Sequence, residues 1–430
     1  MAKTQIFYAP KGTYDILPSD QKYWERINKI VRELAVFYGF ERIDTPIFEE
    51  ASLFSRGLGL TSEVVDKQMY VFKTRGGDEL TLRPEGTAPI VRAYIERGMS
   101  VFPQPLKLYY SGPMFRHENP QKGRFRQFYQ WGLEVFGEKD AVADAQVIHT
   151  SFQVFKELGI SGFNIQVNSI GCKKCRPRFR DVLNNHYHSF LKRLCPDCKR
   201  RFKENIFRLF DCKNENCIAL KQTAPQVIEY LCDECHNHFK YVLEFLDEVN
   251  LPYLLNPYLF RGLDYYSQTV FEFWPENEVI PGNFALGGGG RYNYLVETLG
   301  GKPTPAVGGA FGFERAIEIM RAQKIKVADS KPKIKVFLAQ LGILAKRRCL
   351  KLMEEFRQAG ITVAESFGRD SIKAQMRVAD RLGAEWVLIL GQKEALDGTI
   401  ILREMSSGSQ EVIPQEKVIQ IVKKRLAAKG

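Results

Sequence analysis

Residues 115–136 read FRHENPQKGRFRQFYQWGLEVF, and this stretch decides how the surrounding chain is expected to fold. An apolar and aromatic arm over residues 108–116 leads into it, and a second arm returns after a polar stretch. Between the arms, Asn119 and Gly123 are residues typical of turns. The pattern predicts two extended strands joined by a polar loop.

Side chains of the returning arm alternate between two faces, as they do along any strand. One face is apolar and carries Tyr129, Trp131, Leu133 and Val135. The other face carries Arg126, Phe128, Gln130, Gly132 and Glu134. A solvated outer face is the ordinary interpretation of such a pattern. Here the hairpin also holds several basic residues around an aromatic ring, which favours a nucleotide, because guanidinium forks bind phosphates and a ring stacks on a base.

Length and composition predict a globular protein of two or three domains. The chain has 430 residues, of which 44% are hydrophobic and 12% aromatic. No apolar run reaches the roughly 18 to 20 residues that a membrane span needs. The first residues, MAKTQI, lack the apolar core of a signal peptide. We therefore expect a cytoplasmic protein with no membrane partner.

The charge balance favours a polyanionic partner. Lys and Arg number 62 against 50 Asp and Glu, which gives a formal net charge of +12. Basic surface attracts phosphate backbones and speeds their encounter. Because many basic proteins bind no nucleic acid, the charge alone supports this interpretation only modestly.

Periodicity divides the chain into three parts. The first, residues 1–325, has helical patterns at 22–38 and 144–158 and strand patterns at 40–48 and 163–170, and is expected to be one catalytic domain. Residues 172–250 interrupt it with a cysteine-rich composition and are predicted to be an insertion. After a short polar linker at 328–333, residues 332–430 form the third part.

The third part alternates strand and helix. Strands are predicted at 334–340, 361–365 and 385–390, with helices at 345–360 and 371–382. This order is typical of a small α/β unit with a mostly parallel sheet.

Four further segments carry residues suited to chemistry. They are TLRPEGT at 81–87, RGLDYY at 261–266, ALGGGGRY at 285–292 and PAVGGAFGFER at 305–315. The glycine run at 287–290 matches neither a dinucleotide fingerprint nor a P-loop, because the needed spacing and lysine are absent. Each segment alone has a structural explanation, such as a flexible turn or tight packing. Their order and spacing together are what indicate a function.

Taken together, the segments resemble those of the class II aminoacyl-tRNA synthetases, and within them the histidyl-tRNA synthetase family. The hairpin at 115–136 looks like motif 2 of the class, residues 308–315 like motif 3, and residues 33–50, with Pro46, like the dimer-forming motif 1. RGLDYY and the GGRY sequence at 289–292 resemble segments that distinguish the histidine enzymes. The resemblance covers nearly the whole chain.

The resemblance implies a fold and an activity. The fold is α+β: an antiparallel-sheet catalytic domain with a Cys-rich insertion, followed by a small α/β anticodon-binding domain. The activity is ATP-dependent conversion of L-histidine to histidyl-adenylate and transfer of the histidyl group to tRNA(His). The implied partners are ATP with Mg²⁺, L-histidine, tRNA(His) and a second copy of the chain in a homodimer.

Roles for single residues also follow from the resemblance. Those implied to bind ATP are Arg116, Glu118, Arg124, Phe128 and Arg315. Those implied to bind histidine are Glu85, Thr87, Gln130, Glu134, Arg261, Tyr265 and Tyr266. Arg116 and Arg261 would act on the reacting groups, and Gln121 and Arg126 would meet the acceptor end of the tRNA. The sequence departs from the usual pattern at Asn293, where the family commonly has Asp, and at Leu286 and Gly287, where Cys or a small residue is common.

Eight of the nine cysteines lie in the insertion and fall into four pairs. They are Cys172, Cys175, Cys195, Cys198, Cys212, Cys217, Cys232 and Cys235. Three pairs have the two-residue spacer that lets both thiolates reach one tetrahedral ion, so we expect Zn²⁺ here. Two ions, one ion with a degenerate pair, or a set of free thiols remain open. Disulfides are disfavoured in the cytoplasm, and Cys349 is expected to be a core residue.

A basic run beside Cys198, from Lys199 to Lys203, gives the insertion an expected role in gripping the acceptor arm of the tRNA. Removing the metal or residues 172–250 would then weaken tRNA charging more than histidine-dependent pyrophosphate exchange. Two rival functions are a catalytically inactive paralogue that senses histidine and a zinc-ribbon nucleic-acid protein. The first typically lacks the Arg261 segment, the hairpin arginines or the C-terminal domain, and the second leaves the ordered motifs unexplained.

Overall fold

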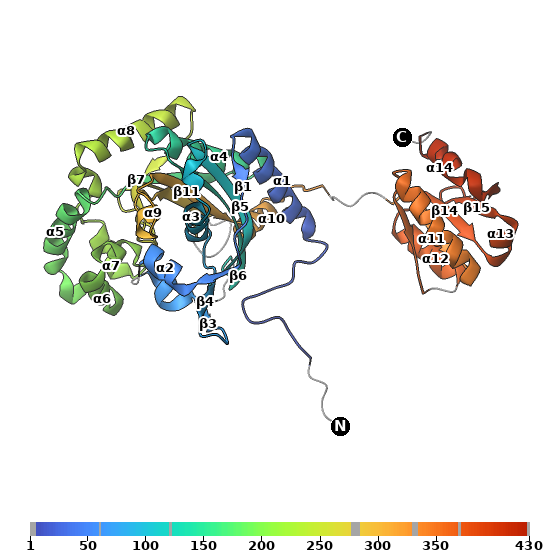
Figure 1. The fold of residues 1–430 in the computed structure, drawn as a ribbon, viewed down its shortest axis with the longest axis horizontal. Helices are drawn as coiled ribbons and strands as arrows, with labels where there is room; N and C mark the ends of the chain where they lie inside the picture. The colour runs from blue at the N-terminus through green and yellow to red at the C-terminus, as the bar shows by residue number, and fades with distance from the viewer. Residues whose placement is uncertain are drawn as a thin grey trace, which may run out of the picture. The chain divides into compact units, whose positions relative to one another are not determined.

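A computed structural model of the chain describes residues 6–59, 62–119, 123–276, 284–328, 334–368 and 371–427. The chain divides into two compact units, residues 1–328 and 329–430. Figure 1 follows the chain from blue at the N-terminus to red at the C-terminus. Within the described ranges, no helix is both long enough and apolar enough to cross a lipid bilayer.

The first unit is built on a mostly antiparallel sheet, as the fold prediction required. The six central strands pair antiparallel with their neighbours. A short strand that pairs parallel lies at each edge of the sheet. In spatial order the strands of this sheet are β1 (Glu41–Arg42), β5 (Leu106–Phe115), β6 (Gln127–Phe136), β11 (Ala306–Gly312), β10 (Gly287–Arg291), β9 (Ser267–Pro275), β7 (Phe163–Ser169) and β8 (Leu254–Leu255).

The hairpin of β5 and β6 has the predicted form. Phe115 and Gln127 are the last paired residues before the connecting loop. Trp131, Leu133 and Val135 are at most 1% exposed and pack into the core on one face. The alternation is therefore confirmed. The polar face is not solvated at its far end, since Glu134 is also fully buried.

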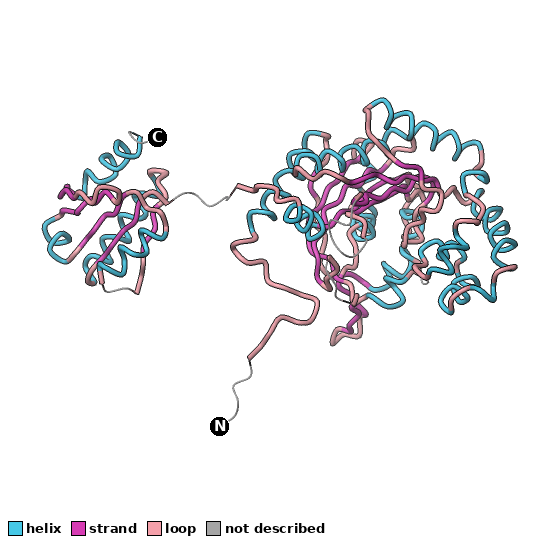
Figure 2. Tube along the Cα trace, turned by 180° about the vertical axis from the view of Figure 1, so that it is seen from behind, coloured by secondary structure: helices cyan, strands magenta, loops and turns pink. Residues whose placement is uncertain are grey.

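Helices cover both faces of this sheet (Figures 1 and 2). One face shares a core with α1 (Gln21–Phe37), α4 (Ala141–Glu157), α8 (Asp233–Glu248) and α10 (Phe313–Ala322). The opposite face shares a core with α2 (Ala51–Leu58), α3 (Thr87–Glu96) and α9 (Leu295–Thr298). The predicted helices at 22–38 and 144–158 thus correspond to α1 and α4, and Gly39, at φ +79°, lets the chain leave α1 in the left-handed region.

The strand predicted at 40–48, with its end near Pro46, was wrong in extent. Only Glu41–Arg42 pairs with β5, and the next strand begins at Phe48. Pro46 has no N–H to donate and restricts the residue before it, so a ladder cannot run through it. The carbonyls of Thr45 and Pro46 accept hydrogen bonds from the buried Arg83 instead.

A smaller sheet and short turns complete the first unit. The sheet has the order β2 (Phe48–Glu50), β4 (Glu79–Leu82) and β3 (Tyr70–Lys73). The turns are the π-helix η1 (Val64–Gln68) and the 3₁₀ helix η2 (Met99–Val101).

The cysteine-rich stretch lies between β7 and β8 and is helical. Its elements are α5 (Cys175–His188), η3 (Leu191–Arg193), α6 (Pro196–Glu204), η4 (Ile206–Asp211), α7 (Glu215–Lys221), η5 (Val227–Tyr230) and α8. Residues between Phe179 and Val227 form a core of their own, which includes Leu183 and Phe210. By contrast, Phe239 and Val242 of α8 belong to the core of the eight-stranded sheet.

The second unit has a five-stranded sheet with helices α11 (Ile343–Gln358), α12 (Ile372–Arg381), α13 (Gln392–Asp397) and α14 (Val418–Ala427), and the 3₁₀ turn η6 (Gln415–Lys417). Its strand order is β13 (Val363–Glu365), β12 (Val336–Gln340), β14 (Trp386–Leu390), β15 (Thr399–Glu404) and β16 (Gln410–Pro414). The three predicted strands are parallel as expected. A further hairpin, β15 and β16, adds two antiparallel pairings, so "mostly parallel" was wrong. Most of the predicted linker, residues 329–333, lies outside the described residues.

Candidate functional site

A fully buried carboxylate, Glu134 on β6, lies at the centre of the candidate site. The Thr87 hydroxyl donates to its Oε1 at 2.7 Å, and the Tyr292 hydroxyl donates to its Oε2. Burial raises the pKa of Glu134 to about 8, although these two hydrogen bonds act in the opposite direction. Gly308 lies opposite Glu134 across the pairing of β11 with β6. A Cβ at that position would collide with the carboxylate, so the site needs a glycine there.

Glu85 lies in the turn that enters α3. Its two carboxylate oxygens accept from the backbone N–H groups of Thr87 at 2.7 Å and Ala88 at 2.8 Å. It thus satisfies donors that the first turn of a helix leaves open. Burial nevertheless raises its pKa. The two carboxylates are close enough for Glu85 to contribute to the raised pKa of Glu134.

Aromatic side chains and open polar atoms line the same face. Tyr265, Tyr266 and Tyr110 are each 5–7% exposed and belong to one core cluster with Tyr292. Two buried polar atoms here, the Gln130 Oε1 and the Tyr110 hydroxyl, have no hydrogen-bond partner among the described residues. Buried polar atoms are normally paired, so two unpaired ones beside Glu134 are suited to a polar ligand.

Three arginines gather at the loop end of the hairpin. Arg116 donates from Nε to the Pro84 carbonyl at 2.9 Å, and its guanidinium lies 5.3 Å from the centre of the Phe128 ring. Arg124 donates to Glu118 at 3.4 Å.

Arg315, at the start of α10, completes this group. It donates to the Gly123 carbonyl at 3.3 Å and to the Ala285 carbonyl at 2.5 Å. Burial lowers its pKa to about 10, and the positive charges of Arg124 and Arg116 contribute. The charges of Arg124 and Arg116 thus act on Arg315, and an anion bound among the three cations would be stabilised.

Arg261 lies beside this group, at the start of the loop that precedes β9. It donates to the Phe271 carbonyl at 3.2 Å, its distance to Glu272 is 3.4 Å, and its guanidinium lies 5.3 Å from the Tyr266 ring centre. Burial by itself lowers the pKa of Arg261, but Tyr266 and Glu272 outweigh it and the net shift is upward. The group therefore remains charged in its buried position.

The structure brings together most of the predicted site residues. Arg116, Glu118, Arg124, Phe128 and Arg315 are linked by the contacts given above, as are Glu85, Thr87 and Glu134. The Arg126 side chain donates to the Glu118 carbonyl at 3.3 Å, on the loop side of the hairpin. Gln121 lies outside the described residues.

Arg291, in the glycine-run segment, and Asn293, directly after it, have structural partners. Arg291 is fully buried and forms an ion pair with the buried Asp144 of α4. Asn293 donates to the Gln268 side chain at 2.7 Å. Neither therefore belongs to the contacts around Glu134, although Tyr292 between them does.

Sequence reasoning missed three contributing residues. Tyr292 holds Glu134, Glu272 pairs with Arg261, and Glu314 accepts from the Tyr129 backbone N–H at 2.9 Å and from the Tyr14 hydroxyl at 3.0 Å. Burial raises the pKa of Glu314 to about 7. Tyr292 lies in the segment 285–292 and Glu314 in the segment 305–315. Membership of these segments was the only sequence feature that could have indicated a role for them. Their partners, Glu134, Tyr129 and Tyr14, are distant in the sequence and could not be assigned from spacing.

The cysteines of the insertion form two separate groups. In each group, the four sulfur atoms lie within 4.8 Å of one another. The first, here called the neck cluster, is Cys172, Cys175, Cys232 and Cys235, and the second, called the distal cluster, is Cys195, Cys198, Cys212 and Cys217. All eight thiols are free of disulfides, so each group could hold one metal ion.

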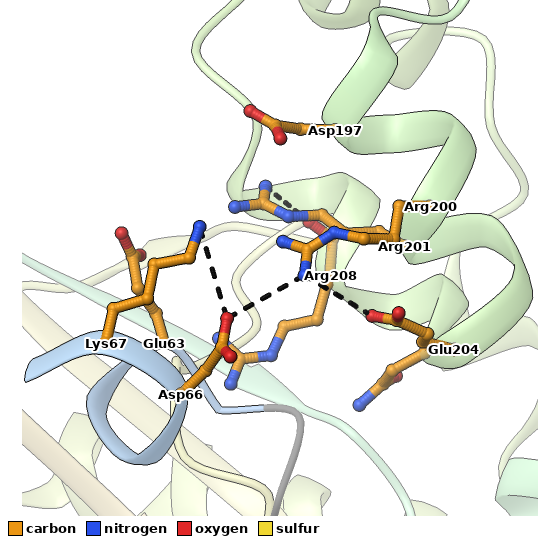
Figure 3. A pocket seen from close by; sticks show the side chains of 9 residues that line it. Glu63, Asp66, Lys67, Asp197, Arg200, Arg201, Glu204 and Arg208 are labelled. Carbon is orange, nitrogen blue, oxygen red and sulfur yellow. Dashed lines mark hydrogen bonds and ion pairs between the residues drawn. The ribbon is translucent and has the colours of Figure 1, made fainter.

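Two arginines of the basic run of the insertion face the turn η1 of the first unit. Figure 3 shows Arg200 and Arg201 of α6 across a small pocket from Asp66 and Lys67 of η1. Arg200 lies 3.7 Å from Asp66, so one residue of the predicted tRNA-binding run is already paired within the chain.

Known proteins resemble the chain over almost its full length. A family model described as histidyl-tRNA synthetase matches residues 12–316, and a model of the anticodon binding domain matches residues 335–425. A histidine–tRNA ligase of Dehalococcoides mccartyi is 45% identical, covering 98% of this chain and 100% of the relative. Another, of Pelotomaculum thermopropionicum, is 42% identical, with 98% of each chain covered. The crystal structure of apo S. aureus histidyl-tRNA synthetase has a TM-score of 0.79 and 34% identity, covering 97% of this chain and 99% of the other.

The antiparallel sheet, with its hairpin and its strand leading into α10, is the architecture of a class II aminoacyl-tRNA synthetase. Within that class the family model spans most of the catalytic unit, and the relatives are matched from end to end. The chain belongs to the histidyl-tRNA synthetase family.

Proposed function

We propose that the chain is a histidine–tRNA ligase: it activates L-histidine with ATP and transfers the histidyl group to the 3′ end of tRNA(His). One observation carries this proposal within the site. Three buried or half-buried arginines lie at the loop end of the hairpin whose second strand also carries a buried carboxylate, Glu134, and the unpaired oxygen of Gln130. An anionic and a small polar substrate are both accommodated by such an arrangement.

ATP is taken as its Mg²⁺ complex at the loop end of the hairpin. Arg116 binds the α-phosphate, and Arg124 and Arg315 bind the outer phosphates. Phe128 stacks on the adenine, with Glu118 on the adenine side. The mutual contacts of these residues support the assignment, because a cation group held by backbone carbonyls is preorganised for phosphate charge.

Histidine binds on the Glu134 face of the sheet. Glu85, Thr87, Gln130 and Glu134 supply its polar contacts, and Tyr265 and Tyr266 wall the pocket. Imidazole donates from one ring nitrogen and accepts at the other. The open Gln130 oxygen supports a donor–acceptor match of this kind. An isostere without the same pattern would leave buried polar atoms unpaired and would be rejected.

The first reaction needs no general base. The histidine carboxylate, already ionised, attacks the α-phosphorus in line, the new carboxyl–phosphate bond forms, and the bond to pyrophosphate breaks. Arg116 and Arg261 stabilise the negative charge that builds around phosphorus. In the second reaction, a hydroxyl of the terminal ribose of tRNA attacks the histidyl carbonyl and AMP leaves.

Recognition of the tRNA involves both units. Gln121 and Arg126 meet the acceptor end, and residues 332–430 form the anticodon-binding domain. Residues 1–325 are the catalytic domain, which contains the 172–250 insertion. The net charge of +12 supports a polyanionic partner.

The chain acts as a homodimer in the cytoplasm. Apolar side chains around the predicted dimer motif support a partner surface, since Phe37 is 78% exposed and Val36 is 61% exposed. Light scattering of the purified chain should give twice the chain mass. Phe37→Glu should shift that mass toward the monomer, and a monomeric wild-type protein would contradict the proposal.

Each cysteine cluster holds one Zn²⁺. Four thiolates at tetrahedral spacing are the usual ligands of a structural zinc site. The ion would link segments that are distant in the sequence. Its proposed role is structural only. Metal analysis of the protein, purified without chelators, should find two zinc ions per chain.

Charging of defined tRNAs tests the ligase function directly. The protein should esterify histidine to a tRNA(His) transcript in the presence of ATP and Mg²⁺, and should not charge a non-cognate transcript. A protein that binds histidine but neither exchanges pyrophosphate nor charges tRNA would instead be the regulatory paralogue.

A further inference from the structure

The RGLDYY segment, residues 261–266, belongs to no helix or strand, and side chains of the insertion hold it. Arg208 donates to the Gly262 carbonyl at 2.7 Å, and Asn205 donates to the Asp264 carboxylate at 3.2 Å. At the other end of the segment, the Arg176 guanidinium donates to the Tyr266 carbonyl. The rest of the first unit contributes a hydrogen bond from the Asp264 N–H to the Leu58 carbonyl at 3.3 Å, together with the contacts of Arg261 to the Phe271 carbonyl and to Glu272.

Core packing holds the tyrosine end of this segment, where Tyr265 and Tyr266 are buried, but the part from Arg261 to Asp264 borders open space. A cavity of about 360 Å³ separates it from the insertion, and both Arg176 and Arg208 line that cavity together with Arg261. Where a segment borders a cavity, its position depends on directional hydrogen bonds more than on the interlocking of side chains. The arginines that cross to Gly262 and Tyr266 are therefore candidates for positioning it.

The neck cluster fixes the base of the insertion next to Arg176. Cys175 immediately precedes Arg176 on α5, and the Cys172 sulfur lies 3.7 Å from that of Cys175 and 3.9 Å from that of Cys232. The Cys232 backbone N–H donates to the Cys175 sulfur at 3.1 Å. A metal ion here would fix the first turn of α5 against the start of α8.

The chain beside the neck cluster is also bonded to the strand that follows the segment. The Gln268 N–H donates to the Gly171 carbonyl at 2.9 Å, and the Ile170 N–H donates to the Gln268 carbonyl at 2.7 Å. Gly171 has φ +68°, and a Cβ there would meet the Cys175 side chain. Two routes therefore lead from the neck cluster to Tyr266: one through Arg176 and one through Gln268.

The distal cluster encloses the other contact. Asn205 and Arg208 lie between Cys198 and Cys212, and both of these cysteines belong to the distal cluster. The Cys198 N–H donates to the Cys195 sulfur at 3.4 Å at the start of α6. A metal ion in this cluster would thus close the loop that presents Arg208.

We propose that the insertion, folded around its two clusters, is a frame that positions the segment 261–266, with Arg176 and Arg208 as the positioning residues. This inference rests on the proposed histidine pocket and on the proposed zinc ions. It gives the insertion a task in amino-acid activation, before tRNA enters. It also changes the earlier expectation that loss of metal would act mainly on tRNA charging.

The arginines are tested by steady-state pyrophosphate exchange. Because Tyr265, Tyr266 and Arg261 stand in the segment, Arg176→Ala and Arg208→Ala should each raise the KM for histidine by about tenfold or more, the size expected for a lost charged hydrogen bond. The KM for ATP should stay within about twofold, since the ATP contacts come from other elements. Arg176→Lys should recover part of the loss, and Arg178→Ala, on the same helix but over the Tyr230 ring, is the matched control.

The metal is tested in the same assay with zinc content measured for each protein. Cys232→Ser should lose about one zinc ion and raise the KM for histidine, and adding Arg176→Ala to it should raise the KM little further, because both changes act on one link. Unaltered histidine KM in Arg176→Ala and Arg208→Ala, or equal rises for histidine and ATP, would overturn the frame. A wild-type protein without zinc would overturn the metal proposal alone, because the arginine variants test the frame independently.

Discussion

At the scale of single residues, Glu134 is a buried carboxylate whose pKa in the folded state, about 8, lies well above the ordinary value of 4.5. Between these two pH values the folded state binds a proton that the unfolded state has released. Stability from this group is therefore complete below pH 4.5 and is lost as the pH rises through 8.

A pH series of thermal unfolding measures this effect. Raising the pH from 7 to 9 should remove about 1 kcal/mol of unfolding free energy through Glu134. Glu134→Gln cannot titrate, so the difference in melting temperature between wild type and variant should change over this range. Parallel curves for the two proteins would show that the Glu134 pKa is not raised.

Arg116 contributes to charge stabilisation in the proposed first reaction. Replacing such a donor removes about 3 kcal/mol of transition-state stabilisation, or about a hundredfold in rate. Arg116→Ala should therefore lower the kcat of histidine-dependent pyrophosphate exchange by about that factor. Arg97→Ala, at a mostly exposed arginine on the surface, is the control and should leave the rate unchanged.

Local pattern predicted which residues share the Glu134 face, because a strand has a fixed period. It could not predict the partner of Glu134, since Tyr292 is 158 residues further along the chain. Contacts of this kind depend on strand order and register, which a single sequence does not specify.

At the scale of elements, the glycine run 287–290 forms β10, in the interior of the sheet. From the sequence alone, a flexible turn was the ordinary interpretation of this run, because glycine is unfavourable in strands. Close approach explains the exception. A Cβ at Gly289 would collide with the carbonyl of Gly308 on β11, and backbone atoms have little room to move.

Gly289→Ala should consequently destabilise the catalytic unit by about 1–3 kcal/mol, the usual cost of overpacking. Gly76→Ala is a suitable control, because its added Cβ would meet only side-chain oxygens at 3.5 Å or more. Thermal unfolding of both variants measures the difference. Equal melting temperatures would contradict the proposed close approach.

Elements with strong local periodicity, such as α1, α4 and β7, were predicted to within a few residues. The hairpin of β15 and β16 was missed, and β1 proved much shorter than expected. In each case the outcome depended on pairing or on hydrogen bonds with distant residues, such as those of Arg83 to Thr45.

At the scale of the whole molecule, the excess of positive charge should act on tRNA and not on histidine activation. The KM for tRNA(His) should rise steeply with salt, because phosphate binding releases counterions, whereas pyrophosphate exchange should change little. Lys199→Ala with Lys203→Ala should reduce the salt slope of the KM. An unchanged salt slope in this variant would show that the basic run of the insertion does not take part in tRNA binding.

The central claim, histidine activation in this site, is tested most directly by ATP–pyrophosphate exchange with each of the twenty amino acids, for wild type and for Arg261→Ala. Wild type should exchange with histidine alone, and Arg261→Ala should lose most of that activity. Exchange supported by another amino acid, or full histidine-dependent exchange in Arg261→Ala, would contradict the account.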